Sequence, residues 1–201
     1  GLINLHAGKL PEYRGGSPLN WQIINNEKYF GLSVIKINKG IDTGDIIFEK
    51  SFKILNKHKI EDLQRIANNF FPKLLYKSIF KLVSRKKLKK KNEKKARYFK
   101  QRKAEDSLIF PSDTTFKKLN LLLRAMSNSY PNPYIIFKDK KIIIKKIKVS
   151  KLKLDFKDES VLINKNKIFV KLKDKEILIK WFWHIIKLNN HKIIFYSCES
   201  K

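Results

Sequence analysis

The first sixty residues alternate between short apolar runs and loops that are rich in glycine and proline. Residues 1–6 have the pattern of the end of a buried strand. The loop that follows, residues 7–18, is long for a compact domain, and loops of that kind are often functional. Ser17 and Pro18 predict the N-cap and first turn of a short helix over residues 19–26.

Two further strands are predicted close behind. Residues 31–37 alternate between apolar and polar side chains, and a turn over residues 40–44 leads into a second strand that begins near Asp45. A strand, a loop and a strand of this segment are therefore expected to face one site.

A long helix and a basic segment come next. The apolar spacing over residues 60–84 is helical, and Pro72 predicts a break or kink within it. Residues 85–95 are mostly lysine, which predicts an exposed linker at a domain boundary.

The rest of the chain has a strand pattern. Ser112 or Asp113 is expected to cap a helix that runs to about Met126. Short alternating runs with polar turns between them then predict a small β-barrel or sandwich. The predicted strands lie at 134–137, 142–149, 161–163, 168–172, 177–183 and 193–196.

Composition adds a strong positive charge to this picture. The 201 residues include 46 Lys and Arg against 18 Asp and Glu, which gives a formal net charge of +28. Such a balance is expected for a nucleic-acid or membrane-surface partner, or for a sequence with a general bias toward lysine. The bias is favoured, because specific phosphate recognition usually recruits arginine. Only six arginines are present: Arg14, Arg65, Arg85, Arg97, Arg102 and Arg124.

Several classes of protein are excluded. The single cysteine, Cys198, rules out an internal disulfide framework and a multi-thiolate zinc site, and the four histidines lack paired metal-ligand spacing. No apolar run approaches the roughly 18 residues that a membrane-spanning helix needs. We therefore expect a soluble, cytoplasmic protein without a bound metal.

Candidate chemistry lies in the first segment. Strand alternation puts Asn4 and His6 on the same side, and Asp42 lies on a loop flanked by glycines. An amide donor, an imidazole and a carboxylate without a nucleophile suit direct transfer of an acyl-like unit to an external amine. The same residues also fit a capping Asn, a loop His and an Asx-turn Asp, and spacing alone does not decide between the two interpretations.

The surrounding motifs resemble a known family. The stretch of residues 4–21, which reads NLHAGKLPEYRGGSPLNW, and the later GIDTGD of residues 40–45 are similar to the folate-dependent formyltransferases. Asn4, His6 and Asp42 match the Asn-x-His and downstream Asp of that family. The resemblance extends to ARYFKQRKAED at 96–106 and to Leu123–Met126 with Tyr130–Pro131, although PNPY at 131–134 departs from the family pattern.

The resemblance implies a fold and a division of the chain. It implies the C-terminal half of a Rossmann-like formyltransferase domain at 1–84, a basic linker at 85–107, and a helix plus a small OB-like β-barrel at 108–201. Family members have about a hundred residues before the Asn-x-His strand, which form the first half of the sheet and most of the folate pocket. The sequence is therefore expected to be an N-terminally truncated fragment, which as given could be inactive.

The resemblance also implies an activity. The amine of an acceptor would attack the formyl carbon of 10-formyltetrahydrofolate, with Asn4, His6 and Asp42 as the catalytic residues. Gly40, Ile41 and Asp42 would lie on the cofactor-binding loop, and Tyr13 and Arg14 are candidates for contacts with the acceptor. The alternative for the last pair is that Tyr13 packs the loop and Arg14 is a solvated surface residue.

The acceptor stays open at this point. The linker motif resembles the branch that formylates nucleotide-linked amino sugars, whereas the basic barrel suits initiator methionyl-tRNA. A different class of function is a non-catalytic RNA-binding barrel. The run Trp181–Phe182–Trp183 then suggests either a platform for base stacking or, as the favoured interpretation, a strand with alternate members in a core.

Overall fold

The computed structural model divides the chain into two compact units, residues 1–102 and 103–201. The structure describes residues 1–127, 130–138, 140–151, 154–156, 160–164, 167–186 and 194–199, without the side chains of 164, 180–186 and 194–199. The two units are described separately below. The division falls inside the segment 85–107 that the sequence suggests as a linker, and the predicted domain bounds themselves stay a prediction.

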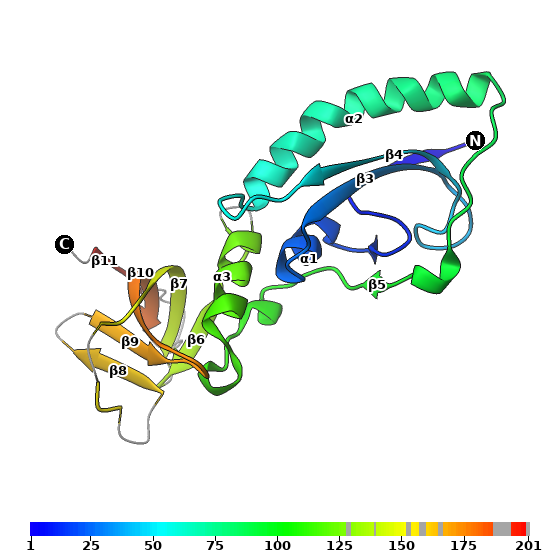
Figure 1. The fold of residues 1–201 in the computed structure, drawn as a ribbon. Coiled ribbons are helices and arrows are strands. Elements are labelled where there is room, and N and C mark those ends of the chain that lie inside the picture. Colours follow the sequence, from blue (N-terminus) through cyan, green and yellow to red (C-terminus); the bar gives the residue numbers. More distant parts are fainter. Residues whose placement is uncertain are drawn as a thin grey trace. The chain divides into compact units, whose positions relative to one another are not determined.

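The first unit is built on a three-stranded antiparallel sheet in the order β1-β3-β4 (Figure 1). Its strands are β1 (Ile3–His6), β3 (Tyr29–Lys36) and β4 (Ile46–Lys53), close to the three predicted from alternation. β3 is buried on both faces between its two exposed end residues, as expected for the central strand. The register sets His6 of β1 opposite Ser33 of β3.

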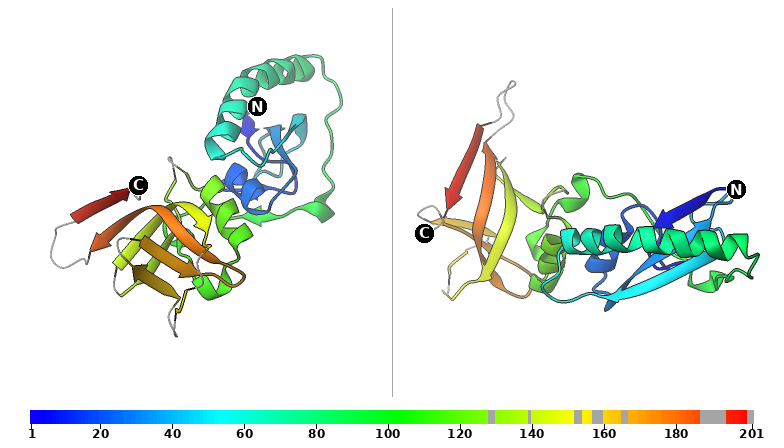
Figure 2. Two further views of the ribbon diagram at one scale, coloured as in Figure 1. Left: turned by 60° about the vertical axis from the view of Figure 1, so that its left-hand side comes forward. Right: turned by 90° about the horizontal axis from the view of Figure 1, so that it is seen from above.

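Two helices accompany this sheet. The short α1 (Pro18–Ile24) follows the long loop, and α2 (Ile60–Val83) runs along β3 and β4 (Figures 1 and 2). α2 continues through Pro72 as one helix, so the predicted break does not occur, and a kink at Pro72 stays a prediction. Its apolar stripe explains the continuity, because burial of the side chains on both sides of the proline holds the helix on the sheet. These side chains are Ile60, Leu63, Ala67 and Leu74, each at most 3% exposed.

After α2 the chain turns back and passes the loop that follows β1 (Figure 1). We call residues 86–102 the return segment. It contains a single 3-10 turn (η1, Glu93–Lys95) and the short β5 (Tyr98–Phe99), which pairs in parallel with β2 (Arg14–Gly15). Most of its side chains are exposed, as predicted for the lysine-rich stretch. Its backbone is nevertheless tied to the first unit, since Lys89 exchanges hydrogen bonds with Ile46.

The second unit begins with two 3-10 turns and one helix. These are η2 (Glu105–Ser107), η3 (Pro111–Asp113) and α3 (Phe116–Ala125). The cap of α3 is Thr115, whose hydroxyl accepts from Lys118 N, and not Ser112 or Asp113. The reason is that residues 111–113 form their own turn before the helix can start.

An antiparallel sheet completes the second unit. The order is β6-β7-β10-β9-β8, with β11 also paired to β10. Among the described strands no pairing joins β8 to β6, so the fold is stated here as a curved antiparallel sheet. The strands are β6 (Tyr134–Phe137), β7 (Lys140–Val149), β8 (Val161–Asn164), β9 (Lys167–Lys171), β10 (Glu176–Ile186) and β11 (Ile194–Glu199).

The core of this sheet follows the alternation predicted from sequence. Ile144, Phe169, Ile177 and Ile179 are each at most 3% exposed. The side chains of Trp181–Phe182–Trp183 and of His184 lie outside the described residues. In the part of the chain that the structure describes, no helix has the length and apolar character needed to cross a membrane.

Candidate active site

The site begins at the end of β1, where Asn4 and His6 alternate onto the same side of the strand. Asn4 is half-buried, and His6 is 6% exposed although it precedes a loop. A titratable side chain buried to this extent is expected to have partners within the protein. Both residues find the same partner, Asp42.

Asp42 lies in the turn between β3 and β4, and its carboxylate contacts three groups. One oxygen, Oδ1, accepts from Asn4 Nδ2 at 3.3 Å, and the other, Oδ2, accepts from Gly15 N at 2.9 Å. Oδ2 also lies 3.5 Å from His6 Nδ1. The three residues predicted as catalytic therefore converge, although 38 positions separate Asn4 from Asp42.

The turn that carries Asp42 has a demanding backbone. Asp42 has φ 51°, a left-handed conformation that Asp and Asn tolerate better than most residues. Two positions later, a Cβ at Gly44 would lie 1.5 Å from the Lys36 carbonyl oxygen. Only glycine fits there, which explains the glycine after the Asp-Thr pair.

His6 has unlike neighbours at its two ring nitrogens. Nε2 lies 2.6 Å from the carbonyl oxygen of Tyr13, while Nδ1 faces Asp42. Burial lowers the pKa of His6 below 6.5, and Lys91 lowers it further, whereas Asp42 and the Tyr13 carbonyl oppose the shift. Burial is the largest of these effects, so the neutral imidazole is favoured near pH 7.

Gly8 makes the close approach at Nε2 possible. A Cβ on this residue would lie 2.5 Å from His6 Nε2 and 2.7 Å from the Tyr13 carbonyl oxygen. The carbonyl of Gly8 also accepts from Ser33 Oγ at 2.8 Å, which fixes the loop against β3. Gly8 thus allows the close packing around His6.

Tyr13 and Arg14 are each 2% exposed. The hydroxyl of Tyr13 donates to Glu27 Oε1 at 2.6 Å, and its ring stacks on Phe99 at 4.9 Å. Burial, aided by Glu27, raises the pKa of Tyr13 to about 12. The alternative in which Tyr13 packs the loop matches this environment, and contacts of Tyr13 and Arg14 with an acceptor stay a prediction.

Arg14 is held by the return segment. Its guanidinium donates to Glu93 Oε1 at 2.8 Å and to the Tyr98 hydroxyl at 3.0 Å, and its Nε donates to the Asp42 carbonyl oxygen at 3.2 Å. The alternative that Arg14 is a solvated surface residue is therefore wrong. The lysine-rich stretch also reaches the site, because Lys91 Nζ donates to the Asp42 carbonyl oxygen at 2.5 Å.

The other two residues predicted on the cofactor loop lie at the surface. Ile41 is 66% exposed, and Gly40 N donates to Asn38 Oδ1 at 3.2 Å within the turn. The same Asn38 oxygen accepts from Thr43 Oγ1 at 2.5 Å. Asn38 and Thr43 thus shape the loop, a role that the sequence analysis did not assign.

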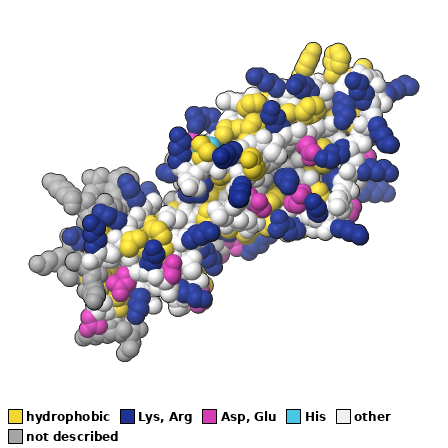
Figure 3. Space-filling view, in the orientation of Figure 1, with side chains coloured by type: hydrophobic (Ala, Val, Ile, Leu, Met, Phe, Trp, Pro, Cys, Tyr) yellow, Lys and Arg dark blue, Asp and Glu magenta, His cyan; other side chains and the backbone are white. Residues whose placement is uncertain are grey.

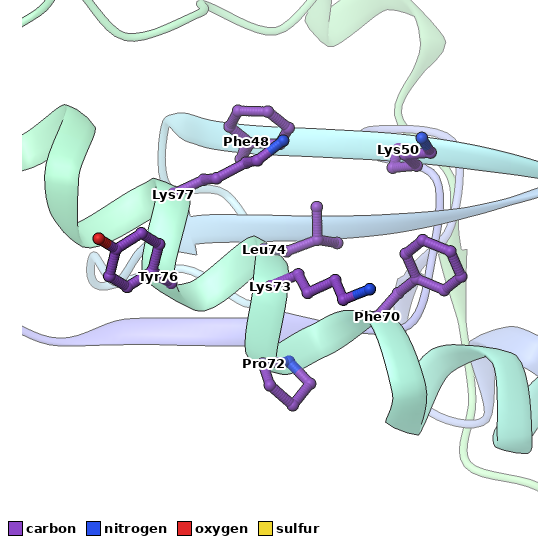
Figure 4. Close-up of a pocket in the computed structure, with 8 residues that line it drawn as sticks. All are labelled: Phe48, Lys50, Phe70, Pro72, Lys73, Leu74, Tyr76 and Lys77. Atoms are coloured by element: carbon purple, nitrogen blue, oxygen red, sulfur yellow. The ribbon is translucent and has the colours of Figure 1, made fainter.

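A separate cavity of about 570 Å³ lies between α2 and β4 (Figure 4). Its lining combines apolar side chains such as Phe48, Phe70 and Leu74 with lysines, and Lys50 Nζ lies 5.8 Å from the centre of the Phe70 ring. It contains no carboxylate or imidazole, so it offers no acid–base chemistry. Among the described residues no group of three His, Cys, Asp or Glu side chains could hold a metal ion.

The positive charge is not confined to the site. Figure 3 shows Lys and Arg side chains distributed over the described part of the face in view. The site itself combines one arginine, one lysine and one histidine with the carboxylates of Asp42 and Glu93. Its chemistry is that of a buried polar cluster.

Comparisons with known proteins agree with this picture. The family model for formyl transferase matches residues 1–79. The bifunctional polymyxin resistance protein ArnA of Wigglesworthia glossinidia brevipalpis is 33% identical over 187 residues, which cover 89% of this chain and 27% of that protein. The methionyl-tRNA formyltransferase of Clostridium tetani is 31% identical over 189 residues, covering 90% of this chain and 58% of its own length.

The fold is also found in a solved structure. The N-formyltransferase from Helicobacter canadensis, solved with folinic acid and dTDP-3-aminofucose, has a TM-score of 0.63 at 22% identity, covering 89% of this chain and 65% of that one. The chain thus spans about a quarter to three fifths of the length of these curated relatives. Residues 1–79 match the formyl transferase family, which is the family that the motifs resemble.

Proposed function

We propose that the protein transfers a formyl group from 10-formyltetrahydrofolate to a primary amine. The observation that carries this proposal is the convergence of Asn4, His6 and Asp42 in a largely buried cluster. An amide N–H and an imidazole beside a fixed carboxylate suit the charge changes of acyl transfer to nitrogen. The cluster lacks a nucleophile that would form a covalent intermediate, so direct attack by the amine is the fitting mechanism.

The reaction forms a bond between the amine nitrogen and the formyl carbon and breaks the bond from that carbon to the folate nitrogen. The amine loses one proton and the folate nitrogen gains one. Asn4 donates to the negative charge that develops on the formyl oxygen. His6 stabilises that charge as its imidazole takes up the amine proton, and Asp42 orients His6. Each preorganised donor of this kind contributes about 3–4 kcal/mol to lowering the barrier.

The residues present fit the formyl end of the co-substrate. Asn4 offers an amide donor and His6 an imidazole, and both contact Asp42. The exposed turn with Gly40 and Ile41 is the segment we assign to contact with the pterin. The folate group supplies an activated formyl carbon, and every other function named here belongs to side chains of this chain.

For the acceptor we propose the amine of a nucleotide-linked amino sugar. This choice is supported by the segment 96–106, whose sequence resembles that of sugar-amine formyltransferases. The segment lies beside the site because β5 pairs with β2. The rival acceptor is initiator methionyl-tRNA, favoured by the net charge of +28. The OB-like closure of the second unit and a cytoplasmic location belong to this same proposal.

The test incubates the complete protein with 10-formyltetrahydrofolate and each acceptor in turn. We expect formylation of a dTDP-linked amino sugar at a kcat/KM at least tenfold above that of methionyl-tRNA. The reverse ratio would assign the protein to the tRNA branch. Tight, strongly salt-dependent tRNA binding without any formyl transfer would instead support the non-catalytic RNA-binding alternative.

A further inference from the structure

The two nitrogens of the His6 ring are distinguished by what each can bind. A carbonyl oxygen only accepts hydrogen bonds, so the contact of 2.6 Å with the Tyr13 carbonyl requires the proton on Nε2. In a neutral imidazole the lone pair is then on Nδ1. Nδ1 points toward Asp42 and not toward the loop.

The distance on the Nδ1 side is consistent with this assignment. A lone pair and a carboxylate cannot share a hydrogen bond, and Nδ1 lies 3.5 Å from Asp42 Oδ2. The carboxylate meanwhile accepts from Asn4 Nδ2 and Gly15 N. A proton that arrives on Nδ1 therefore meets a negative charge that is already oriented.

We propose that Tyr13 is a positioning residue whose backbone carbonyl holds His6 as the Nε2–H tautomer, so that Nδ1 is the nitrogen that takes the proton of the attacking amine. This inference rests on the proposed function. The amine proton passes to Nδ1 as the new C–N bond forms, and it passes on to the folate nitrogen as the old C–N bond breaks. His6 and Asp42 end the cycle unchanged.

The side chain of Tyr13 is what fixes the carbonyl. Its hydroxyl donates to Glu27 Oε1 and accepts from Asn25 Nδ2 at 3.2 Å. Its ring stacks on Phe99 with an interplanar angle of 8°, and its backbone N–H donates to the Lys9 carbonyl oxygen at 2.8 Å. Contacts with Asn25 and Glu27, with Phe99 and with Lys9 thus hold Tyr13 in place, and with it the backbone carbonyl that faces His6.

Few charges face the imidazole. Asp42 lies on the Nδ1 side. Burial lowers the pKa of His6, and Lys91 of the return segment acts in the same direction with a smaller effect. Ser33, opposite on β3, is uncharged. The proton affinity of Nδ1 is accordingly set by burial, Asp42, the Tyr13 carbonyl and Lys91.

The first readout does not depend on activity. In the complete protein with ¹⁵N-labelled histidine, the ring nitrogens of His6, assigned by their loss in His6→Gln, report the tautomer. We expect one tautomer above the His6 pKa, with a protonated Nε2 and an unprotonated Nδ1. An Nδ1–H form, or an even mixture of the two, in the wild-type protein would overturn the proposal.

Variants of Tyr13 supply the second readout. Tyr13→Ala removes every side-chain anchor, and Tyr13→Phe keeps the ring stacking. We expect Tyr13→Ala to mix the tautomers and to lower kcat roughly 100-fold with the KM for the acceptor unchanged, and Tyr13→Phe to restore most of kcat. The matched control is Tyr29→Ala, a tyrosine that is 54% exposed, which should leave both readouts as in the wild type.

The outcomes are distinguishable. A raised KM for the acceptor with an unchanged tautomer in Tyr13→Ala would overturn the proposal and favour a direct acceptor contact. If Tyr13→Ala fails to fold by circular dichroism, the wild-type spectrum and Tyr13→Phe still decide the question. A wild-type protein with the Nε2–H tautomer but no formyl transfer would refute the proposed function, and with it the proton-acceptor role of Nδ1, while the positioning by Tyr13 would stand.

Discussion

The loop around His6 and the sheet of the second unit are held together by different means. In the loop, named polar atoms bind one another: Asp42 alone accepts from Asn4, from Gly15 and, through its carbonyl, from Arg14 and Lys91. In the sheet, buried side chains such as Ile144 and Ile177 are interchangeable in kind and supply apolar area. The first region therefore depends on residue identity, and the second on pattern.

This contrast has a consequence for substitutions. A polar cluster that is fully satisfied loses its function when one atom changes, since the partner groups are left buried without a hydrogen bond. An apolar sheet loses free energy in proportion to the volume removed. The following changes test the contrast, starting from the largest expected effect.

Asp42→Asn should lower kcat about 1,000-fold or more. Both carboxylate oxygens accept hydrogen bonds, so the amide of Asn sets a donor against either Asn4 or Gly15, and the charge beside His6 is lost. Steady-state kinetics on the complete protein measure the effect, with the exposed Asp45→Asn as the matched control. A fall in kcat of less than tenfold would mean that the polar cluster tolerates side-chain substitution as the sheet of the second unit does.

Gly8→Ala should lower kcat roughly 100-fold while the fold is retained. The added Cβ would lie 2.5 Å from His6 Nε2, and the ring or the Tyr13 carbonyl has to move away. The control is Gly1→Ala, whose Cβ comes no closer than 3.9 Å to another residue. Equal activity of the two variants would contradict the packing role assigned to Gly8.

Ile177→Ala should lower the free energy of unfolding by about 2–5 kcal/mol and leave kcat within twofold. The side chain is fully buried in the sheet of the second unit. Thermal and denaturant unfolding give the stability, and Ile163→Ala, at a position 49% exposed, should cost clearly less. A large fall in kcat without loss of stability would show that the sheet takes part in chemistry.

The smallest effect is the pH dependence of stability. Because burial lowers the pKa of His6 below 6.5, the unfolded chain binds more protons than the folded one between the two values. The contribution of His6 is therefore neutral above pH 6.5 and becomes destabilising as the pH falls below it. Unfolding titrations from pH 7.5 to 5 should show a shallower slope in His6→Gln, and an identical slope would contradict the lowered pKa.

Much of this molecule follows from its sequence. Alternation and helical spacing predict β1, β3, β4 and α2 to within a few residues, and the motifs bring Asn4, His6 and Asp42 to one site. The cap of α3 was missed because Ser112, Asp113 and Thr115 are all good capping residues, and the choice among them depends on the turn at 111–113.

The surroundings of the site could not be predicted in the same way. Glu93 and Tyr98 contact Arg14 from 79 and 84 positions further along the chain, and no periodicity encodes that approach. The contact of His6 with Tyr13 uses a backbone carbonyl, which every residue possesses. Residue types signal which side chains do chemistry, but the groups that orient them are visible only in three dimensions.

The central claim is that this polar cluster performs formyl transfer, and one paired measurement tests it most directly. The complete protein, His6→Gln and His58→Gln are each incubated with 10-formyltetrahydrofolate and a dTDP-linked amino sugar, and formylated product is counted by mass spectrometry. His58 is the matched control, because it lies in the loop before α2, where its Nδ1 accepts from Leu55 N at 3.2 Å. We predict that the wild type and His58→Gln form product and that His6→Gln forms none. Equal product from all three proteins would contradict the account.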